Sequence, residues 1–266
     1  MKIIQITDTH LLPPGGRLHG IDPAAQLARI TAHIVADHGD TDLVVITGDL
    51  CNDGDPSAYA MLADLLAPLR CEVRLLIGNH DARPAFRAAF PDHPVDAHGF
   101  VQSWMDTPDG RLLFLDSHEP GHIGGRYCEK RLGWLHEALG SAGEQPVTVF
   151  IHHPPVPDDL AHFRKIGLHD AGAVMALLAA HPAGVRHIVF GHLHVPLCGT
   201  SPEGIAFSAG QSCAHRFITD IDNPTPWWTN GPPCYRVLML DKAGFRAYAA
   251  QLDEPKLARA GVCAGP

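Results

Sequence analysis

The sequence has few basic residues. Only 20 of its 266 residues are Lys or Arg, and the formal net charge is −9. A surface that binds nucleic acid needs clustered positive charge, because contacts to phosphate supply most of that affinity. We therefore expect no nucleic acid polymer among the partners of this protein.

Long hydrophobic runs and cysteine motifs are also missing. No apolar segment approaches the ~20 residues of a membrane-spanning helix, and Met1 leads directly into a strand-like segment without room for a signal peptide. The seven Cys residues are scattered, odd in number and without a Cys-x-x-Cys pair, which fits reduced thiols better than a disulfide framework. We expect a soluble, cytoplasmic protein with no membrane partner.

Apolar residues are present at the usual globular level of 45%, enough for one sizeable core. No internal repeat or linker divides the chain. We predict one domain over residues 1–254 and a C-terminal tail over 255–266. The irregular segment 211–233 is rich in Pro and contains Trp227-Trp228, so a lid and a subunit contact are both consistent with it.

Apolar runs typical of strands alternate with helical patterns along most of the chain, which indicates an α/β fold. The strand patterns cover residues 2–7, 43–47, 72–77, 111–115, 147–151 and 187–190. The helical patterns cover residues 23–37, 56–66, 83–90, 132–139 and 170–178, the last with Asp170 as its expected cap. Residues 91–108 show little pattern. Three later runs, near 205–209, 235–241 and 245–251, have no helices between them and predict an antiparallel sheet edge.

Side chains that can bind metals follow five of these strands. They are Asp8 and His10, Asp49, Asn79 and His80, His152 and His153, and His192 and His194. In α/β sheets ligands bind beyond the carboxyl ends of the strands, so we expect these groups to converge. Mixed imidazole and carboxylate ligands suit Zn²⁺, Mn²⁺ or iron. Their number exceeds a single four-ligand site and predicts two ions that share a carboxylate.

Spacing along an extended chain assigns expected roles to these residues. Asp8 and His10 are two positions apart and can face one ion, while His192 and His194 can each reach a different ion. Only one of the adjacent His152 and His153 can face the metals, and we expect His152 to do so. Asp49 stands alone and is the expected bridge. Any one of these residues could be an ordinary hydrated loop end, but five such strand ends together indicate a site.

In order, these residues match the pattern D-x-H, G-D, G-N-H-[DE], H and G-H-x-H, and so the chain resembles the calcineurin-like metallophosphoesterases. The matching residues are Asp8-Thr9-His10, Gly48-Asp49, Gly78-Asn79-His80-Asp81, His152 and Gly191-His192-Leu193-His194. The length, Asp116-Ser117 and the run His152-His153-Pro154-Pro155 are most similar to class III cyclic nucleotide phosphodiesterases and bacterial glycerophosphodiesterases.

The resemblance implies a four-layer α/β/β/α sandwich and a specific ligand set. The first ion would be held by Asp8, His10, Asp49 and His194, and the second by Asp49, Asn79, His152 and His192. His80 would contact the phosphate or the leaving group, with Asp81 behind it as its catalytic partner. The chain departs from the family at the turn that often reads Gly-Thr-x-His. Here that turn is Gly210-Gln211-Ser212-Cys213, with His215 two places later.

The expected function is hydrolysis of small phosphodiesters, of the cyclic nucleotide or glycerophosphodiester type, by a hydroxide that bridges two metal ions (Mn, Fe or Zn). A phosphomonoesterase or nucleotide pyrophosphatase on the same site is the nearest alternative. A nuclease is disfavoured by the net charge, and a non-catalytic scaffold by the intact ligand set.

Other features are expected to have less specific roles. We expect a homo-oligomer with Trp227-Trp228 at or near the contact, and we favour packing or an interface over base stacking for this pair. Cys213 is expected to be a buried thiol rather than a nucleophile. His118 and His122, on a Gly-rich loop, are candidates to line the pocket.

Overall fold

Apolar strand segments assemble into two β-sheets in the computed structural model, which describes residues 1–157, 159–225 and 227–253. The first sheet has the order β13-β12-β1-β2-β3, with strands β1 Lys2–Ile6, β2 Leu43–Thr47, β3 Glu72–Leu76, β12 Cys234–Asp241 and β13 Gly244–Gln251. The second has the order β4-β5-β6-β7-β9-β8, with strands β4 Ser103–Thr107, β5 Gly110–Leu115, β6 Val147–Ile151, β7 Val185–Phe190, β8 Leu197–Thr200 and β9 Ala206–Ala209.

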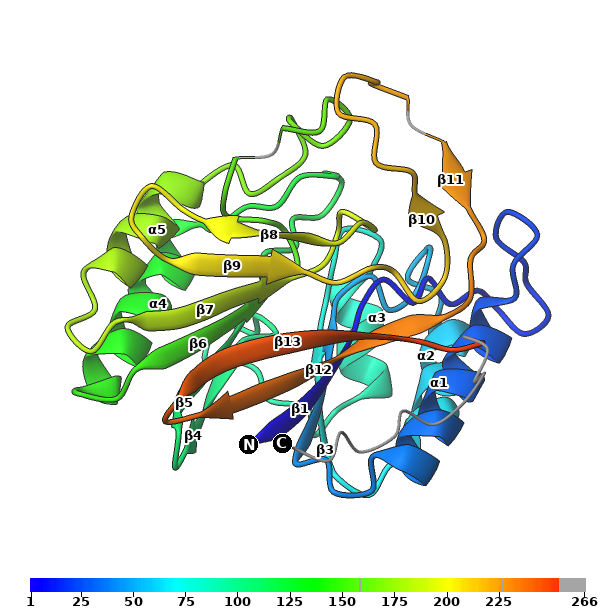
Figure 1. Ribbon diagram of the computed structural model, residues 1–266, viewed down its shortest axis with the longest axis horizontal. Coiled ribbons are helices and arrows are strands. Elements are labelled where there is room, and N and C mark those ends of the chain that lie inside the picture. The colour runs from blue at the N-terminus through cyan, green and yellow to red at the C-terminus, as the bar shows by residue number, and fades with distance from the viewer. Residues whose placement is uncertain (158, 226, 254–266) are drawn as a thin grey trace, which may run out of the picture.

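Helices cover the outer face of each sheet (Figure 1). The first sheet is covered by α1 Pro23–Asp37, α2 Pro56–Leu66 and α3 Arg83–Ala89, and the second by α4 Glu129–Ala142 and α5 Ala171–Ala179. The four-layer α/β/β/α prediction is therefore confirmed. Among the described residues, no helix has both the length and the apolar character needed to cross a membrane.

The two sheets are held face to face by a buried apolar layer. Ile3 and Val45 of the first sheet pack in one cluster with Leu112 and Phe150 of the second. All five residues of β2 and of β6 are buried, because neighbouring layers cover both faces of these strands. Their sequences, which are apolar except for one Thr in each strand, follow from this position.

Helix starts follow local sequence signals in two cases and depart from them in a third. Asp22 accepts a hydrogen bond from the Ala25 amide at 2.9 Å, and Asp55 accepts one from the Ser57 amide at 2.8 Å. A Pro follows each as the first helical residue, where its missing N–H costs nothing. Asp170 is the N-cap residue of α5, as expected, but its side chain accepts from the Tyr127 amide at 2.9 Å and makes no capping bond to the helix.

Three strand expectations differ from the structure. The poorly patterned stretch 91–108 contains β4, a half-exposed strand whose short alternation gives little signal. The three late strands do not form one edge. β12 and β13 extend the first sheet, but β9 lies parallel to β7 in the second, next to β8. The segment 211–233 also forms a short ribbon of β10 Arg216–Phe217 and β11 Trp228–Thr229. The predicted tail, 255–266, lies outside the described residues.

Candidate metal centre

The predicted ligands come together where β1, β2, β3, β6 and β7 end, so both sheets contribute to one site. The ligand atoms of Asp8, His10, Asp49 and His194 all lie within 4.8 Å of one another, and these are the residues expected to hold the first ion. The His10 Nε2 and His194 Nε2 atoms are only 3.0 Å apart. Two neutral imidazoles can share at most one proton across such a contact, whereas both nitrogens can bind one cation.

The second expected set is centred on His152. Its Nε2 atom lies 3.4 Å from Asp49 Oδ2 and 3.3 Å from Asn79 Oδ1. The His192 ring lies 5.1 Å from that of His152, centroid to centroid. Asp49 Oδ2 is also 3.7 Å from His10 Nε2. Asp49 thus lies between the two sets, where a bridging carboxylate is required.

His153 lies behind this cluster, with both of its ring nitrogens engaged. Its Nδ1 atom is 2.8 Å from the Ser117 hydroxyl, and its Nε2 atom is 3.0 Å from the Ile123 carbonyl oxygen. The neutral ring can accept from Ser117 and donate to Ile123 at the same time. His152, His153 and His192 nevertheless offer ligand atoms within 4.8 Å of one another, so the choice of His152 over its neighbour stays a prediction.

The backbone of the cluster is unusual. Among the described non-Gly residues, those with positive φ are Asp8 (53°), His10 (45°), His19 (52°), Asp49 (49°), His192 (68°), His194 (54°) and Asp253 (66°). Five of them are predicted ligands, and L-residues adopt this region at an energetic cost. Asp8 and His10 do face one site, as expected, but the expected reason, an extended chain, is wrong. A left-handed backbone brings them together.

Two glycines of the motifs are required by the closeness of the ligands. A Cβ atom on Gly78 would lie 2.2 Å from Asp49 Oδ1 and 2.6 Å from His152 Nε2. A Cβ atom on Gly191 would lie 2.1 Å from Thr7 Oγ1. Any side chain at either position would displace a ligand or the residue that supports it.

Backbone carbonyls orient two of the imidazoles. The Nδ1 atoms of His152 and His194 lie 2.8 Å from the Thr47 oxygen and 2.9 Å from the His215 oxygen, so each Nδ1–H donates and Nε2 is free for a metal. His192 Nε2 is buried and has no hydrogen-bond partner in the structure. An unpaired buried nitrogen is costly unless something binds it. The donor set therefore fits divalent transition metals.

The electrostatics of the cluster favour the neutral forms of His10 and His192 and the charged form of Asp8, but they favour the protonated form of His152. Burial lowers the pKa of His10 and of His192 to about 3. Burial disfavours the charged form of Asp8, but His194 outweighs this and lowers the pKa of Asp8 to about 2. Burial likewise opposes protonation of His152, yet the adjacent Asp49 raises its pKa to about 9. The cluster thus favours a positive charge beside Asp49, and a metal ion would compete with this proton.

His80 lies at the edge of the cluster and is exposed. Its amide donates to Asp49 Oδ1 at 3.0 Å, and its Nδ1 atom is 2.8 Å from the Asn52 carbonyl oxygen. Asp81 does not orient it. The Asp81 carboxylate instead accepts from the amides of Leu50, Cys51 and Gly78 and from the Tyr59 hydroxyl, over 2.8–3.1 Å. The expected His80–Asp81 pair is therefore wrong, and the Asn52 carbonyl takes the orienting position.

A cleft with a volume of about 230 Å³ opens over the cluster. Asn52 and His80 lie along it, and an aromatic group contributes His19, His162, Phe163, Phe217 and Trp228. His118 and His122 do not line it, contrary to expectation. His215 does, with its ring 4.3 Å from that of His194. Sequence reasoning gave no role to Phe163 or Phe217, which carry no signal beyond their apolar character.

Cys213 is fully buried, and burial raises its pKa well above the usual value, in agreement with an inert thiol. The described cysteines, Cys51, Cys71, Cys128, Cys198, Cys213 and Cys234, are all free.

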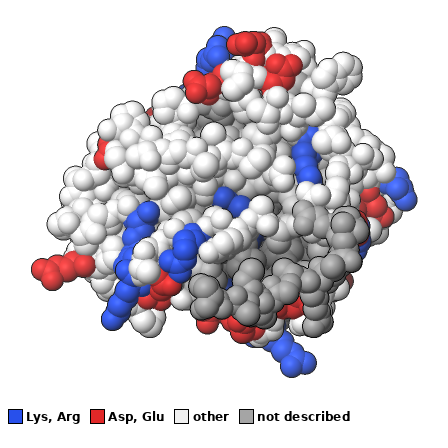
Figure 2. All heavy atoms as spheres, in the orientation of Figure 1, with Lys and Arg blue, Asp and Glu red and all other residues white. Residues whose placement is uncertain are grey.

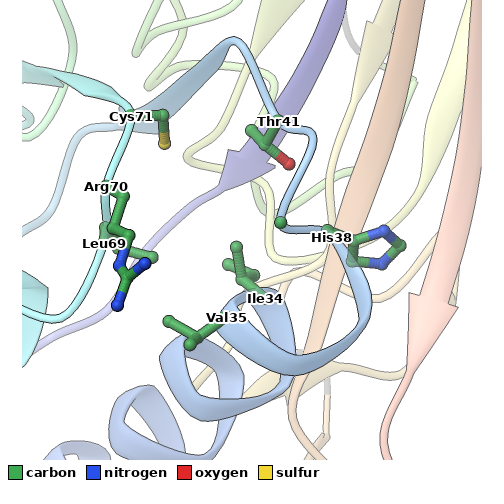
Figure 3. A pocket seen from close by; sticks show the side chains of 8 residues that line it. Ile34, Val35, His38, Thr41, Leu69, Arg70 and Cys71 are labelled. Atoms are coloured by element: carbon green, nitrogen blue, oxygen red, sulfur yellow. The ribbon is translucent and has the colours of Figure 1, made fainter.

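A second hollow lies at the opposite ends of the strands. It is formed where α1 ends and where β2 and β3 begin, with Ile34, Val35, Leu69, Arg70 and Cys71 around it (Figure 3). The His38 ring does not enter it. The ring points toward the strands, where its Nε2 atom is 2.7 Å from the Tyr235 hydroxyl. This hollow gathers no set of ligands comparable to the cluster at the carboxyl ends.

The chain belongs to the calcineurin-like phosphoesterases, because the model of that family matches residues 1–196. It is 37% identical over 225 residues to a probable cyclic nucleotide phosphodiesterase of Rhodopseudomonas palustris, covering 83% of this chain and 81% of the relative. It is 30% identical over 238 residues to the glycerophosphodiester phosphodiesterase GpdQ of Enterobacter lignolyticus, covering 88% and 84%. These two relatives bear out the resemblance.

Solved structures agree with the fold. A dimetal phosphatase from Danio rerio aligns with a TM-score of 0.67 at 15% identity, covering 94% of this chain and 98% of that one. The purple acid phosphatase PPD1 of yellow lupin aligns with a TM-score of 0.66 at 14% identity, covering 94% and 51%. At these identities the likeness concerns the fold alone. The chain is thus a metallophosphoesterase whose buried His and Asp clusters are consistent with a dimetal site.

Proposed function

We propose that this protein is a binuclear metal-dependent phosphodiesterase that hydrolyses small phosphodiesters to phosphomonoesters. The observation that carries the proposal is the convergence of two ligand sets on Asp49, with Oδ2 3.7 Å from His10 Nε2 and 3.4 Å from His152 Nε2. In this proposal the first ion is held by Asp8, His10, Asp49 and His194, and the second by Asp49, Asn79, His152 and His192. Two bound cations would offset the charge on the phosphoryl group and lower the pKa of the attacking water.

The charge of the ligand set supports a diester substrate. Asp8 and Asp49 are its only carboxylates, and its other members are imidazoles and an amide, which carry no charge when they bind a metal ion. Two divalent cations would therefore leave a net positive charge even after a water molecule has lost its proton. A positive site inside an acidic protein suits a small anion, and a phosphodiester carries a single negative charge.

The protein supplies its own candidate proton donor, His80. Its Nδ1–H donates to the Asn52 oxygen, and the ring lines the cleft. When the ring is protonated, Nε2–H remains to donate to a departing alkoxide or to a phosphate oxygen. Asn52 thus fixes the orientation of the ring and leaves its second nitrogen free.

Cleft size and surface charge support small substrates over polymers. A volume of about 230 Å³ is below the ~300–1,000 Å³ of most ligand pockets, so little more than a small ester fits inside. On the face drawn in Figure 2, Lys and Arg lie singly or in small groups among acidic residues and form no continuous basic track.

The free thiols of the described residues support a cytoplasmic location.

A comparison of a diester and a monoester that share the same leaving group, p-nitrophenolate, tests the proposal. We expect the Mn²⁺-loaded protein to cleave bis(p-nitrophenyl) phosphate with a higher kcat/KM than p-nitrophenyl phosphate, and to cleave cyclic AMP or glycerophosphodiesters but not duplex DNA. Asp53→Asn, an exposed change next to Asn52, is the control that should leave the rate intact. A preference for the monoester would favour the phosphomonoesterase alternative. Efficient, salt-sensitive DNA cleavage would favour a nuclease.

A further inference from the structure

The cleft has two unlike sides. Asn52 and His80 form a polar side, whereas Phe163, Phe217 and Trp228 form an apolar side that we call the aromatic wall. The wall begins directly beside the proposed ligands. The Phe217 ring centroid lies 5.5 Å from that of His194, and the Phe163 centroid lies 6.0 Å from that of His192. A phosphate seated on the metals would place an ester substituent within reach of these rings.

The rings of the wall form a corner. Phe163 and Phe217 meet at an interplanar angle of 75° with centroids 5.4 Å apart. A flat ring that stacks on one of them therefore presents its edge or face to the other, and both geometries are favourable between aromatic rings. Trp228 extends the wall toward the rim, where it is 49% exposed. An indole at a cleft edge leaves apolar surface that a ligand can cover.

The wall is held in place before any ligand arrives. Phe217 and Trp228 are directly opposite each other in the β10–β11 ribbon, and Trp228 also packs on His19, with ring centroids 3.3 Å apart. The loop that carries Phe163 is tied to the same segment, because the Ala161 amide donates to the Ile221 oxygen at 2.9 Å. A preformed surface binds without the cost of ordering its side chains.

We propose that the aromatic wall of Phe163, Phe217 and Trp228 determines specificity by binding a flat aromatic substituent of the phosphate ester. This inference rests on the proposed function, since it assigns the ester group that accompanies the phosphate at the same site. It ranks the candidate substrates by affinity: esters that carry an aromatic ring bind more tightly than esters of glycerol or other open-chain alcohols. Trp228, for which the sequence favoured packing or an interface over base stacking, becomes part of the binding surface.

Binding of two phosphonates tests the wall without chemistry. Benzylphosphonate and cyclohexylmethylphosphonate have the same charge and similar size, and their P–C bonds are not hydrolysed. We expect calorimetry on the Mn²⁺-loaded protein to give a Kd for the benzyl compound about two- to tenfold lower, although cyclohexyl is the more hydrophobic group. The ratio of the two Kd values, cyclohexylmethyl over benzyl, should fall to about one in Phe217→Leu and in Trp228→Leu.

Trp104→Leu is the matched control. Trp104 is 41% exposed on β4 and packs on Trp134, away from the cleft, so this variant should keep the wild-type ratio. A wild-type ratio of one would overturn the inference, as would a ratio unchanged in the folded Phe217→Leu or Trp228→Leu variant. Hydrolysis of bis(p-nitrophenyl) phosphate by the same samples separates the two claims. If the Kd ratio depends on the wall but the ester is not hydrolysed, only the proposed function is contradicted. If the ester is hydrolysed but the Kd ratio does not depend on the wall, only the role of the wall is contradicted.

Discussion

His80 lies over the site with one ring nitrogen already committed. Its Nδ1 atom contacts the Asn52 oxygen at 2.8 Å, so only Nε2 can serve the substrate. The residue is not a proposed ligand, and its substitution should leave the metals bound. A proton donor matters most when the leaving group is a poor one, which makes the leaving group a sensitive probe of this role.

We expect His80→Ala to retain both ions and to lose about 10²–10⁴ in kcat for alkyl diesters, with a small loss for p-nitrophenyl esters, whose leaving group needs no proton. Measuring kcat for both ester types, together with metal content, checks this. His122→Ala changes an exposed histidine that does not line the cleft and is the control. Equal losses for the two ester types would rule out proton donation by His80.

At the scale of elements, Asp81 fastens together the loops that follow β2 and β3. Its carboxylate accepts from the amides of Leu50 and Cys51 on one side and of Gly78 on the other. These loops carry Asp49 and Asn79. Asp81 therefore acts on the site by positioning its backbone rather than by contact with the substrate.

We expect Asp81→Ala to lower the free energy of unfolding by about 3 kcal/mol or more, because several buried donors lose their acceptor. Tyr59→Phe removes one of those donors, at 2.9 Å, and should cost only about 1–2 kcal/mol. Urea unfolding of both variants measures this. An Asp81→Ala protein with wild-type stability and no activity would instead support the catalytic role expected from the sequence.

β7 carries a histidine that should make stability depend on pH. His187 stacks on Phe245 and its Nε2 atom is 2.8 Å from Ser208 Oγ. Burial, aided by Arg236, lowers its pKa from 6.5 to about 4. The unfolded chain therefore takes up this proton at a higher pH than the folded one. The contribution of His187 to the free energy of unfolding is therefore present above about pH 6.5 and is lost as the pH falls toward 4.

We expect His187→Gln to reduce the fall in unfolding free energy between pH 6.5 and pH 4 by about 2–3 kcal/mol relative to wild type. Denaturant titrations across this range measure the slope. His136→Gln, at an exposed position on α4, is the control. Parallel pH profiles for wild type and His187→Gln would contradict the account.

The sequence predicts those parts of the protein that depend on local signals. The segments 43–47 and 147–151, apolar except for one Thr in each, predict their strands with the observed bounds, because burial on both faces favours apolar residues. The half-exposed β4 escapes prediction for the same reason. The sheet partner of β9 and the role of Asp81 could not be predicted, since both depend on which segments meet in space. The motifs predict the site residues, but not the left-handed backbone that brings them together.

At the scale of the whole molecule, exposed apolar residues gather on the segment that includes β10 and β11, whose course is drawn in Figure 1. Ile218, Ile221 and Trp227 are 50%, 51% and 74% exposed. Monomers rarely expose large apolar patches without a function. We propose a homo-oligomer, most simply a dimer, with this segment at or near the contact.

Light scattering should show a dimer at micromolar concentration for the wild type and a monomer for Trp227→Asp, because a charge in an apolar contact is costly to bury. Val35→Asp places the same charge at a 45% exposed site on α1 and should leave the dimer intact. A monomeric wild type would remove the basis of the proposal.

In the proposed function, the strand ends of both sheets hold two metal ions around Asp49. Anomalous diffraction at the Mn edge, from crystals of the Mn²⁺-loaded protein, tests it most directly. We expect two peaks ~3.5–4 Å apart. One should contact Asp8, His10 and His194, the other Asn79, His152 and His192, and both Asp49. Asp49→Ala should lose the metals and the activity together. A single peak, or two ions retained in Asp49→Ala, would contradict the binuclear account.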